Sequence, residues 1–194
     1  MIEGPFNGSD AIRAGLVRKH ELRSTYSAMF PDVYAPKGIQ LTVRQRAVAA
    51  WLWSGRGATI MGFSAAGLHG AKWLDVDLPI ELIWSNARPP RGLRTAHLQI
   101  DPSERMLLGG LTVTTAQRTT FDIGRRHPTG PTVARMDALL RATGISVDEV
   151  EALLRLILVE AGLPRPCTQI PVRSSDGWST YYLDMGWEDI KVAV

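Results

Sequence analysis

The sequence contains a single cysteine, Cys167, which excludes an internal disulfide and a zinc site built from several cysteines. Long apolar runs are absent: the densest, at 47–53, is far shorter than the ~18–20 residues that a membrane span needs. The first five residues contain neither a basic nor an apolar segment, which argues against export. Because 45% of the 194 residues are hydrophobic and 21% are charged, we expect a soluble, globular, cytoplasmic protein without a membrane partner.

Positive and negative charges are unevenly distributed along the chain. The formal net charge is +3, but residues 1–56 hold eight Lys and Arg against four Asp and Glu, a net charge of +4. Residues 131–194 hold six against nine, a net charge of −3. A basic N-terminal region can contact the phosphate backbone of a nucleic acid. The same charge is also compatible with a solvated surface that binds nothing.

The first 40 residues predict two short helices followed by a hairpin. A side-chain oxygen of Asn7 or Ser9 can cap a first helix, which Gly15 ends. A second short helix is predicted over 18–24, and the aromatic-rich run 26–36, with its Pro-Asp turn, predicts a hairpin. This order is that of a winged helix-turn-helix, so residues 1–40 are predicted to form a DNA-binding domain.

From residue 41 onward, helical and strand patterns alternate. Helices are predicted at 43–53, 65–69, 116 to near Arg126, 131–142 and 147–161, capped where a hydroxyl precedes them by Thr42, Ser64, Thr115 and Ser146. Strands are predicted at 59–63, 79–84, 93–100, 111–114, 167–173, 178–185 and 190–194. The fold class is therefore α+β, with the winged helix, a central α/β region over 41–145 and a C-terminal segment over 146–194.

Several phrases resemble one family. The sequences AIRAGLVRKHELR at 11–23, FPDVYA at 30–35 and LTVRQRA at 41–47 resemble the N-terminal winged helix of AbiEi-type antitoxins, the transcriptional repressors of type IV toxin–antitoxin systems. The segments FSAAGLHG at 63–70 and VTTAQRTTFD at 113–122 resemble segments at the corresponding positions of that family. The resemblance covers about residues 1–145. It implies a transcriptional regulator whose partner is DNA, such as the operator of a cognate toxin gene.

The candidate DNA-binding residues are the cations of the predicted second helix, Arg18, Lys19, His20 and Arg23. They fall within one and a half helical turns, where the first three can meet phosphates and Arg23 can reach a base edge in the major groove. Arg44 is a further candidate, although it and Arg46 also suit the exposed first turn of the next helix. The alternative for the whole group is a solvated basic face.

Three other groups of residues could take part in binding or catalysis, but a structural role is the simpler interpretation of each. Arg88, Arg91 and Arg94 surround a proline-rich turn, where they fit either a second phosphate contact or a solvated loop. His69 has no nucleophile or metal ligand at suitable spacing, so we expect a hydrogen-bonded histidine in the core. Arg118 and Asp122, four residues apart, predict an ion pair on a helix surface.

The C-terminal segment carries a second resemblance. EALLRLILVEAGLP at 151–164, TQIPV at 168–172 and YLDMGW at 182–187 resemble the opening of a Vsr-like endonuclease domain of the PD-(D/E)XK fold, which often follows an AbiEi-like front in actinobacterial proteins. The resemblance implies a Mg²⁺ site in which Glu151 matches the helix Glu and Asp184 the strand Asp. The third acidic residue would follow Val194, and a helical stretch before Glu151 is missing.

These observations predict a DNA-binding regulator of the AbiEi antitoxin type that has no cofactor and carries a truncated, vestigial nuclease segment. The alternative is a Mg²⁺-dependent endonuclease of the Vsr-like class, completed by dimerisation or by Glu188 or Asp189. A decayed gene product without a function is a third possibility. The sequence leaves the DNA target, the cognate toxin and the oligomeric state open.

Overall fold

The computed structural model describes residues 2–72, 78–85, 88–125 and 130–193. Its fold is mixed α+β, as the sequence predicts. The chain divides into two compact units, residues 1–150 and 151–194, and each is described by itself. The predicted helix end near Arg126 and the predicted strand end at Val194 lie outside the described residues.

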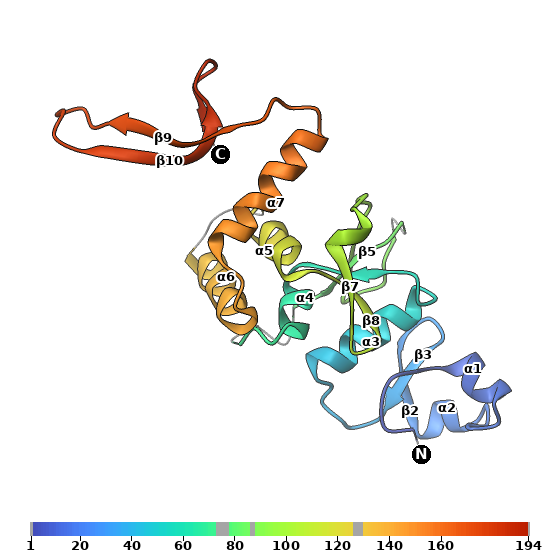
Figure 1. The fold of residues 1–194 in the computed structure, drawn as a ribbon. Coiled ribbons are helices and arrows are strands. Elements are labelled where there is room, and N and C mark those ends of the chain that lie inside the picture. Colours follow the sequence, from blue (N-terminus) through green and yellow to red (C-terminus); the bar gives the residue numbers. More distant parts are fainter. Residues whose placement is uncertain (1, 73–77, 86–87, 126–129, 194) are drawn as a thin grey trace. The chain divides into compact units, whose positions relative to one another are not determined.

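The first unit holds most of the secondary structure (Figure 1). Its helices, and a helix α7 that continues into the second unit, are α1 (Gly8–Arg13), α2 (Glu21–Ser24), α3 (Val43–Trp53), α4 (Gly62–Leu68), the 3-10 helix η1 (Pro102–Glu104), α5 (Ala116–Gly124), α6 (Gly130–Thr143) and α7 (Val147–Glu160). Its strands are β1 (Phe6–Asn7), β2 (Tyr26–Phe30), β3 (Val33–Pro36), β4 (Thr59–Ile60), β5 (Ile80–Ile83), β6 (Leu93–Ala96), β7 (Arg105–Leu108) and β8 (Leu111–Thr114).

The N-terminal module, residues 2–40, is a small sheet with two short helices. Asn7 caps α1 by accepting a hydrogen bond from the backbone N–H of Asp10 at 2.9 Å, and Gly15 follows the helix with a positive φ of 68°. The hairpin β2–β3 is antiparallel, and β1 pairs with the other edge of β3. Phe6 and Tyr26 pack edge to face in a buried cluster that also holds the helices. The predicted first helix and hairpin are confirmed.

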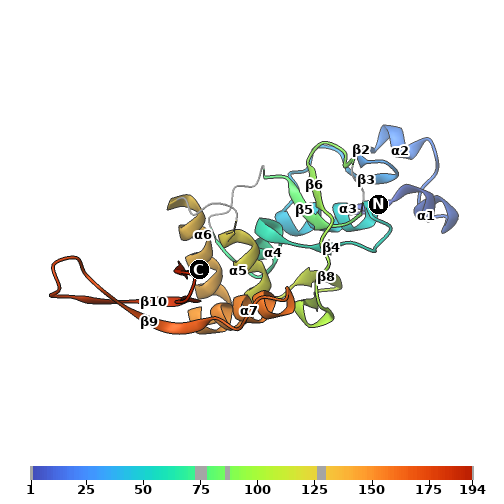
Figure 2. The same cartoon turned by 90° about the horizontal axis from the view of Figure 1, so that it is seen from above.

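Helix α3 connects the N-terminal module to the central sheet. It begins at the predicted cap: the Thr42 hydroxyl accepts from the Gln45 N–H, and the Gln45 side chain accepts from the Thr42 N–H. Three alanines of α3, Ala47, Ala49 and Ala50, are completely buried. Figures 1 and 2 show the helix between the strands of the module and those of the central sheet, and it contacts elements of both.

The central sheet has five strands in the order β6-β5-β4-β8-β7. The pairs β5–β6 and β4–β8 are parallel, whereas β4–β5 and β7–β8 are antiparallel. Its core is built from small and branched apolar side chains, among them Ile60, Leu82 and Val113, none of which is exposed. Helices α4, α5 and α6 pack on one another in a second cluster around Ile123 and Leu139.

The sequence prediction misplaced the boundary between β4 and α4, and it missed three elements, β1, η1 and β7. The strand ends at Ile60 and the helix begins at Gly62, so the prediction that Ser64 caps this helix is wrong. The Ser64 hydroxyl instead accepts a hydrogen bond from the backbone N–H of Glu81 on β5, at 3.0 Å. Strands β1 and β7 were not predicted, because two residues of β1 and the exposed face of β7 give no alternating pattern.

The second unit is dominated by an antiparallel hairpin of β9 (Cys167–Arg173) and β10 (Thr180–Trp187), with β11 (Val192–Ala193) paired to β10. The predicted hairpin is confirmed. Few of its apolar side chains are covered: Ile170 and Met185 are buried, whereas Tyr181 and Tyr182 are more than 60% exposed. In the described part of the chain, no helix combines the length and apolar character needed to span a bilayer.

The exposed hairpin predicts a difference in hydrogen exchange. Amides of β9 and β10 open with little loss of buried surface, whereas opening α3 uncovers a closed core, so we expect α3 amides to exchange at least about 100-fold more slowly. Exchange measured by mass spectrometry on the whole chain tests this. Equal protection of residues 167–187 and 43–53 would contradict the description of the hairpin as weakly packed.

Candidate nucleic-acid interface

The four predicted DNA-binding cations lie together at the exposed surface of the N-terminal module. Arg23 is on α2, but α2 begins only at Glu21, so the prediction of a helix from residue 18 is wrong. Arg18, Lys19 and His20 occupy the turn that precedes it. The Glu21 carboxylate fixes this turn by accepting from the Arg18 N–H at 2.6 Å, and the Glu21 N–H donates to the Arg18 carbonyl.

Apolar anchors on both sides hold this basic turn in place. Val17 and Leu22 are buried in the cluster of the module, so the side chains between them are directed outward. The Lys37 ammonium, which follows β3, donates to the carbonyls of Arg23 and Ser24 at 2.6 and 3.1 Å and satisfies the end of α2. The arrangement presents cations on a segment whose backbone is fixed.

The ion pairs of this module involve other cations. Arg13 and Arg56 both form ion pairs with Asp10, at 3.1 and 3.0 Å. Among the residues that the structure describes, no ion pair involves Arg18, Lys19 or Arg23, all of which are exposed. Their charges therefore remain available to a negatively charged partner.

Arg44 and Arg46 differ from this group, because each is tied to a backbone carbonyl. Arg44 is exposed and donates to the Gly109 carbonyl at 2.6 Å. Arg46 is half-buried and donates to the Leu78 carbonyl at 2.7 Å. Both contacts join the first turn of α3 to the central sheet.

The prediction of a surface ion pair between Arg118 and Asp122 is wrong, because both side chains are buried. The Arg118 guanidinium donates to the Asp122 carboxylate at 3.2 Å and to both oxygens of the Glu104 carboxylate at 2.8 and 3.0 Å. Arg125, which is partly exposed, also pairs with Asp122. This network joins η1 to α5, and the burial of Arg118, Glu104 and Asp122 indicates a structural role. His69 is hydrogen-bonded as predicted, with its Nε2 2.8 Å from the Thr114 carbonyl oxygen, but it is half-buried and not in the core.

The two residues matched to the nuclease ligands lie on different elements of the second unit. Glu151 is half-buried on α7, and Asp184 is exposed on β10. Glu188 and Asp189 lie in the exposed turn between β10 and β11. Nowhere in the described ranges are three or more His, Cys, Asp or Glu side chains grouped to hold a metal ion.

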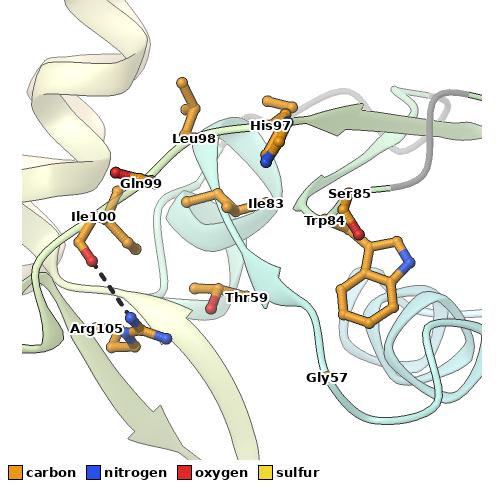
Figure 3. Close-up of a pocket in the computed structure, with 11 residues that line it drawn as sticks. Gly57, Thr59, Ile83, Trp84, Ser85, His97, Leu98, Gln99, Ile100 and Arg105 are labelled. Atoms are coloured by element: carbon orange, nitrogen blue, oxygen red, sulfur yellow. Dashed lines mark hydrogen bonds between the residues drawn. The ribbon is translucent and has the colours of Figure 1, made fainter.

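A cleft that the sequence did not reveal lies at one end of the central sheet. It has a volume of about 500 Å³, and Trp84, His97 and Arg105 are among the residues that line it (Figure 3). These residues come from the ends of β5 and β6 and from the start of β7. Because β7 was not predicted, no sequence signal placed Arg105 beside the other two.

No protein-family model, no curated protein and no solved structure matches the chain.

The buried Arg118 network predicts a large loss of stability in Arg118→Met. This change leaves the Glu104 carboxylate buried without its cation, which typically costs about 3–5 kcal/mol in the free energy of unfolding. Arg13→Met, which removes an exposed ion pair, serves as the control and should cost less than about 1 kcal/mol. Urea denaturation measures both, and equal losses for the two variants would contradict the structural role.

Proposed function

We propose that the chain is a DNA-binding transcriptional regulator of the AbiEi antitoxin type and that its first 40 residues act as a winged-helix module on an operator. The observation that carries the proposal is the exposed group Arg18, Lys19 and Arg23, for which the described residues offer no carboxylate partner. Duplex DNA carries one negative charge per about 1.7 Å of its axis and supplies the counter-charges.

The order of elements supports the winged-helix interpretation. Two short helices, α1 and α2, are followed directly by the β2–β3 hairpin, and β1 joins this hairpin to the start of α1. In helix-turn-helix proteins the residues at the start of the second helix approach base edges, while neighbouring segments contact the backbone. Here the cations of the turn and of α2 would enter the groove, and the hairpin would lie beside it.

The side chains suit different parts of the DNA. Arg18 and Lys19, on the turn, are placed for phosphates, which fix the position of the protein but carry no sequence information. Arg23, on α2, has the planar donor geometry that reads guanine O6 and N7 in the major groove. His20 lies between the two and can donate or accept a hydrogen bond.

For residues 146–194 we propose no nuclease activity. Hydrolysis of a phosphodiester by a metal-dependent nuclease needs an ion that activates water and offsets charge on the scissile phosphate. Glu151 and Asp184 supply two carboxylates, and no further acidic residue joins them in the described part of the chain. The alternative, a Mg²⁺-dependent endonuclease, would need ligands from a second copy or a rearrangement around Glu188 and Asp189.

Removing the cations of the module should weaken DNA binding and reduce its salt dependence. The variant carries Arg18→Ala, Lys19→Ala and Arg23→Ala, and the probe is a labelled duplex about three helical turns long. The slope of log affinity against log salt is negative, and each lost phosphate contact reduces its magnitude by about 0.9. The magnitude should therefore decrease by about 1.8–2.7 in this variant. Fluorescence anisotropy between about 50 and 200 mM salt measures it.

The control for this experiment has the same change in net charge elsewhere. Arg141, Arg165 and Arg173 are exposed, and no ion pair involves them in the described residues, so their triple alanine variant is the match. This control should keep the parental slope. A module variant that binds as tightly as the control would overturn the assignment of the DNA-binding surface.

A nuclease assay separates the regulator from the alternative enzyme. We expect no cleavage of plasmid or mismatched duplex with Mg²⁺ or Mn²⁺, and unchanged DNA binding in EDTA, because the carboxylate set is incomplete. The comparison variant is Glu151→Ala with Asp184→Ala. If the parent nicks DNA and this variant does not, the enzyme interpretation replaces ours.

A further inference from the structure

The edge of the central sheet formed by β6 is a second exposed basic surface in the first unit. In the described part of the sheet, β6 pairs with β5 on one side and has no strand on the other. Arg94 is exposed on this strand, and Arg91 is exposed in the turn that directly precedes it. Arg105, also exposed, starts the opposite edge strand β7, and its guanidinium donates to the Ile100 carbonyl at 3.3 Å.

The carboxylates of the same region are mostly bound inside the fold. Glu81 is 4% exposed and accepts from the Phe63 N–H at 2.8 Å, and Glu104 is 7% exposed and belongs to the Arg118 network. Asp101 is the exposed exception among the described residues of 78–105. The hydrogen bond from the Ser103 hydroxyl lowers its pKa, so it stays ionised and holds η1. The surface therefore keeps a net positive charge.

The surface is hollowed by two open clefts that share residues. The first has a volume of about 500 Å³ and reaches Arg105, and the second has about 460 Å³ and reaches Arg94. Trp84 and His97 line both. Figure 3 shows Arg105 on one side of the first cleft and Trp84 on the other.

The Trp84 ring packs closely over Gly57. A Cβ at Gly57 would lie 2.7 Å from an atom of the Trp84 ring, so the ring occupies the space that a side chain would fill. Trp84 and His97 line both clefts, one of which reaches Arg105 and the other Arg94. Neighbouring clefts that share lining residues suit an extended chain more than a compact small molecule.

We infer that the surface of Arg91, Arg94, Trp84, His97 and Arg105 binds the sugar–phosphate backbone of the DNA that the N-terminal module holds. The inference rests on the proposed function and names the second part of its interface. Arg91 and Arg94 are three residues apart, at most about 10 Å along an extended chain, and a DNA strand offers a phosphate about every 3.4 Å of axis. Both surfaces belong to one compact unit.

The test removes, in the full chain, the arginines at the two edges of the sheet: Arg91 and Arg94 at β6 and Arg105 at β7. The variant Arg91→Ala, Arg94→Ala and Arg105→Ala should lower the slope of log affinity against log salt by about 2.7, using the labelled duplex described above. The variant Arg141→Ala, Arg165→Ala and Arg173→Ala loses the same charge and should keep the parental slope. Arg91→Glu alone, in a turn, repeats the test with the least risk to folding and should weaken binding more than Arg141→Glu.

The outcomes distinguish this inference from the proposed function. If the sheet-edge variants bind with the slope of their controls, the inference is wrong, whatever the module variant does. If the module variant keeps the parental slope and the sheet-edge variants lose theirs, the proposed recognition surface is wrong and the sheet-edge contact stands. If removing these arginines weakens binding of single-stranded DNA more than binding of duplex DNA, the contact with a duplex backbone is overturned. The same holds if the parent chain binds no duplex at low salt.

Discussion

The burial of the alanine face of α3 is the interaction on which the rest of the first unit depends. Ala47 and Ala50 belong to the core of the central sheet, and Phe30, from the hairpin of the N-terminal module, packs against that same core. Small side chains let the helix approach both sheets, and a bulkier residue at these fully packed sites would cost about 1–3 kcal/mol. Hydrogen bonds from Arg44 and Arg46 to backbone carbonyls beside the central sheet help to orient the helix. The module is thereby fixed to the sheet and is not a tethered arm.

The acidic and basic residues of this unit have different surroundings. Its described carboxylates accept hydrogen bonds from the protein itself at Asp10, Glu21, Asp32, Glu81, Asp101, Glu104 and Asp122, and Glu81, Glu104 and Asp122 are buried. Cations are left on the outside, at the turn before α2 and along the edge of β6. A modest net charge of +3 can therefore still produce locally basic surfaces that attract a polyanion.

The sequence predicted the features that depend on neighbouring residues. The caps at Asn7 and Thr42 and both hairpins follow from side chains that bond their own turn. Features that depend on distant partners were missed. Arg118 was placed on a surface because its second partner, Glu104, is 14 residues away on η1, an element that was not predicted although Asp101 and Glu104 form a capping box. The cleft beside Trp84 was missed for the same reason, since the residues around it meet only when the sheet forms. The candidate DNA-binding cations were predictable as a group, but not the turn that carries them.

The central claim is that DNA contacts the basic turn of the module, and chemical-shift mapping tests it most directly. Amide shifts of the isotopically labelled full chain would be followed as duplex DNA is added at moderate salt. Our account predicts that the largest changes fall in residues 16–24, with further changes at 88–97 and 105, and that the hairpin of 167–187 is unaffected. Changes confined to the hairpin, or none at 16–24 while the duplex is bound, would contradict it.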